Sequence, residues 1–81
     1  MPTIVIYGAQ DCDDTQRTRN YLTVHNIPFD EVDIAQDAQA EQFVIFINRG
    51  YRSTPTLVIG EGQRKLILTE PSDEQLAAEL A

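Results

Sequence analysis

Cys12 is the single cysteine of this 81-residue chain and the side chain best suited to form a covalent intermediate. It lies between an apolar run, residues 3–7, and a helical pattern that begins near Asp14. The first turn of a helix leaves backbone N–H groups without intrahelical partners, and these groups stabilise an anion such as a thiolate. The placement therefore predicts thiol chemistry by a partly exposed cysteine at the start of a helix.

Charged and polar neighbours should tune this thiol. Three acidic residues surround it: Asp11, Asp13 and Asp14. A carboxylate ~6 Å from a thiolate repels it by roughly 1 kcal/mol, comparable with the ~0.3–1 kcal/mol that a helix terminus supplies. The three carboxylates are therefore expected to disfavour the thiolate and to make Cys12 react more slowly. Arg17 could offset them if it lies close, and the Thr15 hydroxyl could donate a hydrogen bond to the sulfur.

The second candidate feature is a proline loop about forty residues further on. Thr54 and Pro55 open another apolar run, residues 56–59. A proline at the head of a strand cannot donate to the ladder on that side, so the neighbouring carbonyl groups can face a ligand. Arg52 lies just before the loop. If the loop lies beside the cysteine turn, Arg17 and Arg19 form a positive spot with Arg49 and Arg52; the alternative is that they are solvated arginines at helix ends.

Composition limits the classes of function. Thirteen acidic against six basic residues give a net charge of −7, which opposes binding to nucleic acid and to anionic membranes. One cysteine with one histidine excludes an internal disulfide and a tetrahedral zinc site within one chain. Without an apolar run of membrane-spanning length or a signal segment, we expect a cytoplasmic protein with one domain, residues 1–81, and a monomeric state.

Hydrophobic periodicity predicts an alternating order of elements. The predicted strands are residues 3–7, 29–34, 56–59 and 65–68, with a turn at 60–62 between the last two. The predicted helices are residues 14–26, a second one capped by Asp37 and stopped by Gly50, and a final one opened by a capping box of Ser72 with Gln75. His25, at the end of the first helix, is expected to be packed or half-exposed rather than a base.

This order implies a parallel βαβ unit joined to an antiparallel hairpin, in one four-stranded mixed sheet with helices on both faces. It is an α/β arrangement of the thioredoxin type. Over nearly its whole length the chain resembles the glutaredoxin family, in particular its short mycoredoxin-like and NrdH-like members. The matching segments are residues 4–7, 31–34, 48–56 and 68–72.

The resemblance implies thiol–disulfide exchange at Cys12 and a cis peptide bond before Pro55. It also implies a groove for a low-molecular-weight thiol of the glutathione or mycothiol type, with disulfide-bearing proteins as the other substrates. In such a groove the backbone of Thr54 would pair with the thiol, and Arg52 would lie near its carboxylate. Ser72 and Asp73 would lie at a second helix start. No tightly bound cofactor or metal is implied.

The chain departs from the family at the second cysteine of the usual Cys-x-x-Cys motif, which is Thr15 here. Three functions remain open. The first is a single-cysteine thiol–disulfide oxidoreductase, in which a second small thiol resolves the mixed disulfide. The second is a redox-inactive binding or regulatory module with the same fold. The third is a homodimer bridged by an iron–sulfur cluster, with external thiols completing the ligands.

Overall fold

The computed structural model describes residues 3–80. Its elements are β1 (Ile4–Gly8), α1 (Asp13–Val24), β2 (Asp30–Asp33), α2 (Ala38–Ile47), β3 (Thr56–Glu61), β4 (Arg64–Thr69) and α3 (Asp73–Leu80). The order of strands and helices is the predicted one. The apolar segment 43–47, which has strand propensity, is helical.

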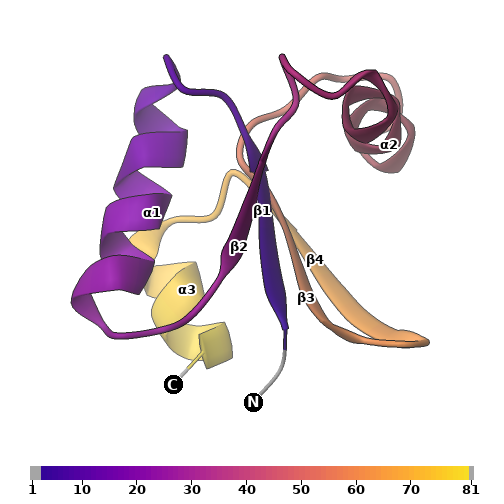
Figure 1. The fold of residues 1–81 in the computed structure, drawn as a ribbon. Helices are drawn as coiled ribbons and strands as arrows, with labels where there is room; N and C mark the ends of the chain where they lie inside the picture. Colours follow the sequence, from indigo (N-terminus) through magenta and orange to yellow (C-terminus); the bar gives the residue numbers. More distant parts are fainter. Residues whose placement is uncertain (1–2, 81) are drawn as a thin grey trace.

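The four strands form one mixed sheet in the order β2-β1-β3-β4. β1 pairs in parallel with β2 and antiparallel with β3, and β3 pairs antiparallel with β4. Helices α1 and α3 lie on one face of the sheet and α2 lies on the other, as Figure 1 shows. The predicted thioredoxin-like fold class is therefore confirmed.

Two apolar clusters hold these layers together. On the side of α1 and α3, Ile6, Leu57, Leu22 and Leu76 are completely buried, and each comes from a different element. On the side of α2, the smaller cluster is built from three buried residues with Tyr7 and other partly buried neighbours; the three are Ile34, Ala40 and Val44. Full burial of such side chains contributes about 1.5–3 kcal/mol each, so β1 is fixed from both faces directly below the cysteine turn.

The predicted helix caps are present. Asp37 accepts a hydrogen bond from the backbone N–H of Ala40 at 3.1 Å. The hydroxyl of Ser72 accepts from the backbone N–H of Gln75 at 3.2 Å, and the Gln75 side chain accepts from the Ser72 N–H at 3.1 Å. After α2, Gly50 adopts a positive φ of 100° and its N–H binds the Ile45 carbonyl at 2.8 Å. These hydrogen bonds fix where α2 and α3 begin and where α2 ends.

Several predicted boundaries were wrong. Helix α1 ends at Val24, because Asn26 adopts a φ of +57° and the Ile27 N–H turns back to the Leu22 carbonyl. β2 is limited to Asp30–Asp33 by its pairing with β1. The predicted turn at 60–62 is a two-residue turn at 62–63, because pairing between β3 and β4 continues to residues 61 and 64.

None of the helices within residues 3–80 has the length and apolarity needed to cross a membrane.

Candidate functional site

Cys12 is the N-cap of α1, as predicted, and its side chain is partly exposed. Its backbone is extended, with φ −96° and ψ 119°, and its carbonyl accepts the first helical hydrogen bond from the Gln16 N–H at 3.1 Å. Its own N–H donates to the Ala9 carbonyl at 3.2 Å. The turn after β1 therefore holds the sulfur over the open N–H groups of the helix.

The proline loop lies directly against the thiol. The Thr54 hydroxyl donates to the Cys12 sulfur at 3.3 Å, and the thiol donates to the Thr54 carbonyl at 3.6 Å. The peptide bond between Thr54 and Pro55 is cis, as the resemblance implied, and Pro55 is buried. The predicted proximity of the two segments is thus confirmed, although they are 42 residues apart in sequence.

Asn48 fastens this loop, a role that sequence reasoning missed. Its amide donates to the Val44 carbonyl at 2.8 Å and to the Thr56 hydroxyl at 3.1 Å, and it accepts from the Thr69 hydroxyl at 2.7 Å. One side chain thereby joins the end of α2, the start of β3 and the end of β4. Asn48 belongs to the segment 48–56 that carried the family resemblance, but only the fold shows what its amide contacts.

Thr15 is completely buried below the sulfur, at the position where the family has its second cysteine. Its hydroxyl accepts from the Ala9 N–H at 3.4 Å, which leaves its proton free for the Cys12 sulfur. The close approach depends on Gly8: a Cβ there would lie 2.9 Å from Thr15 Oγ1 and still closer to Cγ2. The contact between Gly8 and Thr15 could not be predicted from the sequence, because no helical or strand pattern encodes it.

The thiol is acidified by hydrogen bonds. Burial raises the pKa of Cys12, but hydrogen bonds from the Thr15 and Thr54 hydroxyls and from the Thr15 and Asp14 N–H groups lower it by more. The net pKa is below the ordinary value of a cysteine, so a larger fraction is thiolate at neutral pH. The direction of the shift is thus set by donors that point at the sulfur.

The guanidinium groups of Arg17 and Arg52 bind other partners than the sulfur. Arg17 donates to Asp73 at 2.5 Å and to the Pro71 carbonyl at 2.6 Å, and it lies 3.6 Å from Asp14. Arg52 donates to Glu41 at 2.7 Å. Within residues 3–80, no hydrogen bond or ion pair joins either guanidinium to the sulfur. Arg19 is likewise paired, with Glu31. Three of the four arginines of the expected positive spot are therefore neutralised by carboxylates, and Arg17 ties α1 to the start of α3.

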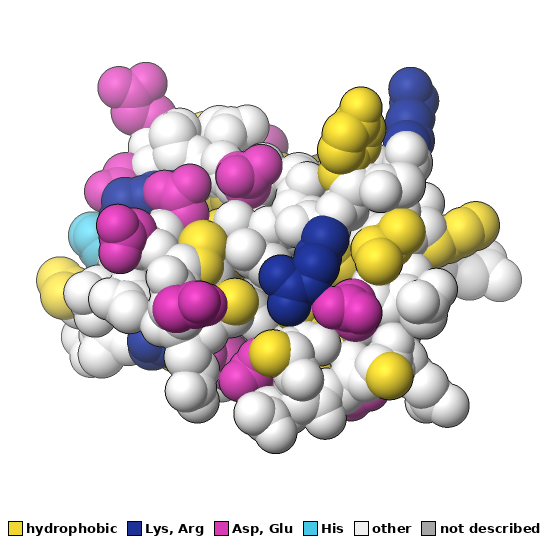
Figure 2. Space-filling model, turned by 90° about the horizontal axis from the view of Figure 1, so that it is seen from above, with side chains coloured by type: hydrophobic (Ala, Val, Ile, Leu, Met, Phe, Trp, Pro, Cys, Tyr) yellow, Lys and Arg dark blue, Asp and Glu magenta, His cyan; other side chains and the backbone are white. Residues whose placement is uncertain are grey.

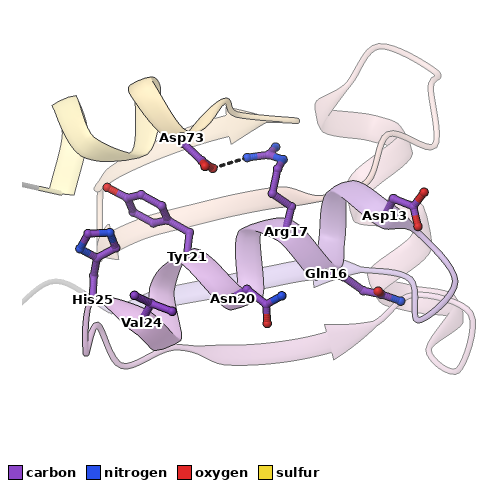
Figure 3. Close-up of a pocket in the computed structure, with 8 residues that line it drawn as sticks. All are labelled: Asp13, Gln16, Arg17, Asn20, Tyr21, Val24, His25 and Asp73. Atoms are coloured by element: carbon purple, nitrogen blue, oxygen red, sulfur yellow. Dashed lines mark hydrogen bonds and ion pairs between the residues drawn. The ribbon is translucent and has the colours of Figure 1, made fainter.

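Two hollows lie beside the thiol on the side of α1 and α3. The first, of about 490 Å³, runs along α1; it is lined by Asp13, Gln16, Arg17, Asn20, Tyr21, Val24, His25 and Asp73 (Figure 3). The second, of about 630 Å³, lies at the start of α3; it is lined by Asp14, Arg17, Glu70, Ser72, Asp73, Glu74 and Gln75. Arg17 and Asp73 line both hollows. Cys12 lines neither, but the first begins at the next residue.

The surface around the thiol is divided by charge. Figure 2 shows most acidic side chains of this face gathered over the side of α1, with hydrophobic side chains toward the side of α2. Asp11, Asp13 and Asp14 are exposed. Nowhere in the described part of the chain do three His, Cys, Asp or Glu side chains converge as metal ligands would. His25 is exposed rather than packed or half-exposed, and its ring stacks on Tyr21 with centroids 4.3 Å apart.

Replacing Thr54 by valine is expected to raise the pKa of Cys12, because the hydroxyl that donates to the sulfur is removed. Alkylation by iodoacetamide at neutral pH should slow roughly threefold, from the loss of one hydrogen bond of ~0.5–1.5 kcal/mol. The measurement is the rate of alkylation as a function of pH. Thr23→Val, on the exposed side of α1, makes the same chemical change away from the sulfur. An unchanged pH profile in Thr54→Val would contradict the role of this hydroxyl.

Comparisons with known sequences agree with this geometry. The sequence profile of the glutaredoxin family matches residues 4–63. A protein of Mycobacterium tuberculosis strain H37Rv whose name assigns it to the glutaredoxins is 35% identical over 77 residues, which cover 95% of this chain and 88% of the relative. The N-acetyl-S-hydroxy-L-cysteine reductase of Bacillus subtilis strain 168 is 27% identical over 78 residues, which cover 96% and 83%.

Solved structures share the fold. A crystal structure of a thioredoxin-like protein, determined in mutant form, superposes with a TM-score of 0.79 at 29% identity and covers 98% of this chain and 100% of its own. The crystal structure of a glutaredoxin from Archaeoglobus fulgidus superposes with a TM-score of 0.70 at 20% identity, and covers 99% and 87%. At 20% identity, the likeness to the Archaeoglobus fulgidus protein concerns the fold alone.

Proposed function

This chain belongs to the glutaredoxin family, and we propose that it is a single-cysteine thiol–disulfide oxidoreductase that works through a mixed disulfide with a low-molecular-weight thiol. The observation that carries the proposal is the lowered pKa of Cys12, which has its origin in hydrogen bonds from Thr15, Thr54 and the helix start. A thiolate, and not a thiol, is the nucleophile in disulfide exchange. A merely structural cysteine would gain nothing from donors aimed at its sulfur.

The proposed cycle has two exchanges. In the first, the Cys12 thiolate attacks the small-thiol sulfur of a protein mixed disulfide; a new S–S bond forms, and the protein sulfur leaves with the electron pair and takes a proton from water. In the second, the thiolate of another small thiol attacks the adduct and releases the Cys12 thiolate. In total, one free small thiol and the small thiol carried by the protein end as their disulfide, and the protein mixed disulfide is reduced to the thiol.

The replacement of the second cysteine by Thr15 determines which mechanism is open to the chain. A hydroxyl cannot resolve the adduct, so the second exchange needs an external thiol. Thr15 serves instead by stabilising the Cys12 thiolate, both when it attacks and when it leaves. Since the cycle consumes reduced small thiol, it suits a reducing compartment, and we propose a cytoplasmic location.

The small thiol is proposed to lie between the proline loop and the start of α3. Glutaredoxins use low-molecular-weight thiols as cosubstrates, and the backbone of Thr54 beside the sulfur would pair with such a ligand. Arg52 is exposed, and its single ion pair within residues 3–80 is a surface pair with Glu41, so it could turn to a ligand carboxylate. Ser72 and Asp73 line the hollow at the helix start, where they would complete the site.

The proposal is tested by intact-mass spectrometry after incubation with oxidised glutathione and, separately, with other low-molecular-weight disulfides. We expect one small-thiol adduct per chain, formed faster above neutral pH than below it and removed by a reductant. Protein whose cysteine has first been alkylated is the control. If none of the disulfides forms an adduct, even at a pH where the thiol is ionised, the chain is a redox-inactive module.

A further inference from the structure

We propose that the groove along α1 binds a positively charged, extended segment of a disulfide-bearing substrate protein, adjacent to the cysteine that exchanges with Cys12. The inference rests on the proposed thiol exchange and adds the class of protein substrate. The groove is the first of the two hollows described above, formed between α1 and the start of α3 (Figure 3).

The groove starts at the turn that carries the reacting cysteine. It begins at Asp13, the residue after Cys12, and runs to Val24 and His25 at the other end of the helix. Eleven residues of α-helix rise about 17 Å, which equals the length of about five residues of extended chain at ~3.3 Å each. A small thiol attached to Cys12 would reach only the near end. An occupant that fills the groove while its disulfide lies at Cys12 is therefore a polypeptide.

The charge of this surface selects a basic segment. Two carboxylates line the groove itself, Asp13 and Asp73, and three more line the neighbouring hollow at the start of α3: Asp14, Glu70 and Glu74. They face a single guanidinium, that of Arg17, which is bound to Asp73 and to the Pro71 carbonyl and lies near Asp14. Asp13 has no ion-pair partner within residues 3–80. Lysine or arginine beside the substrate cysteine would meet uncompensated negative charge, whereas an acidic segment would be repelled.

The far end of the groove offers a different contact. The rings of Tyr21 and His25 lie 4.3 Å apart with an interplanar angle of 35°, and Val24 beside them is 75% exposed. In Figure 3 these three side chains lie together at one end of the helix, away from Asp13. Such a surface accepts the stem of a long side chain, with a cation over an aromatic face. The groove thus matches a segment that is basic near its cysteine and carries a long side chain about five residues further on.

The test uses two synthetic peptides that differ only at three positions beside one cysteine, which are lysine in one peptide and glutamate in the other. The cysteine of each is joined to mercaptoethanol in a mixed disulfide, so attack by Cys12 on the mercaptoethanol sulfur releases the peptide thiol, which is followed by chromatography. The measured quantity is the ratio of the two second-order rate constants. We expect the lysine peptide to react about tenfold faster at low ionic strength, with the ratio falling towards one in high salt.

A matched pair of variants places the effect in the groove. Asn20 is exposed on the groove wall, so Asn20→Lys should lower the ratio at least threefold and Asn20→Asp should raise it. Gln42→Lys makes the same change in net charge on the exposed side of α2 and should leave the ratio near that of the wild type. Thermal melts check that each variant is folded.

Hydroxyethyl disulfide, which is neutral and carries no peptide, tests the thiol exchange separately from the selection of charge. If it reacts while the peptide ratio is one, the groove does not select charge and this inference is wrong. An equal fall of the ratio in Gln42→Lys and Asn20→Lys also overturns it, because net charge would then suffice. If the neutral disulfide does not react either, the proposed thiol exchange fails, and the inference fails with it.

Discussion

Cys12→Ser is expected to reduce thiol transfer to the uncatalysed background. No other residue of the chain can form a mixed disulfide, and a serine hydroxyl does not attack disulfides. The measurement is the reduction of hydroxyethyl disulfide by a small thiol in the presence of the protein. It is accompanied by the mass of the protein after exposure to the disulfide.

The loss of thiol transfer in Cys12→Ser should come from the missing thiol and not from unfolding. Serine is only slightly smaller than cysteine, and position 12 is partly exposed. The melting temperature should therefore change little. Gln42→Ala, on the exposed side of α2, is the control for the effect of substitution and purification, and it should retain the wild-type rate. Thiol transfer that persists in Cys12→Ser would contradict the oxidoreductase proposal outright.

Gly8→Ala is expected to lower the free energy of unfolding by about 1–3 kcal/mol, the usual cost of overpacking a buried site. The added Cβ would collide with the side chain of Thr15, which is completely buried and has no free space to enter. Displacement of Thr15 would also remove its hydrogen bond from the sulfur, so alkylation of Cys12 at neutral pH should become slower. Denaturant unfolding and the pH profile of alkylation measure the two effects.

A double-mutant cycle tests whether the Gly8–Thr15 contact is the cause. Thr15→Ser removes the methyl group that lies nearest to the added Cβ and keeps the hydroxyl. The pair Gly8→Ala/Thr15→Ser should therefore be less destabilised than the sum of the single changes. If the two changes simply add, the cost of alanine at position 8 lies elsewhere.

Most of the fold could be predicted from the sequence, because the signals that set its helices and turns are local. Asp37 and Ser72 are hydrogen-bonding residues that cap a helix within three residues of themselves, and both predicted caps are present. The hairpin turn was misplaced because Gly60 and Gly62 are equally good turn residues. The pairing of residues 61 and 64 across the two strands, which no local pattern encodes, decided between them.

The candidate site was less predictable because its decisive contacts join distant parts of the chain. Arg17 could be recognised as a cation near Cys12, but its partner Asp73 lies 56 residues away. Arg52 was equally conspicuous in the sequence, and it is paired with Glu41. Thr15 could be proposed as a donor to the sulfur from its spacing. The space for its side chain, however, exists because Gly8 of β1 has no Cβ, and this contact is not visible in the sequence.

The position of β2 at the outside of the sheet has a consequence for self-association. The outer side of an edge strand presents unpaired N–H and C=O groups, which can accept a strand from another molecule. Three of the four residues of β2 are acidic; Glu31 is paired with Arg19, whereas Asp30 and Asp33 have no ion-pair partner within residues 3–80. A second copy added there would place like charges opposite each other, which is destabilising. This edge therefore resists growth into an intermolecular sheet, a protection that weakens as salt screens the carboxylates.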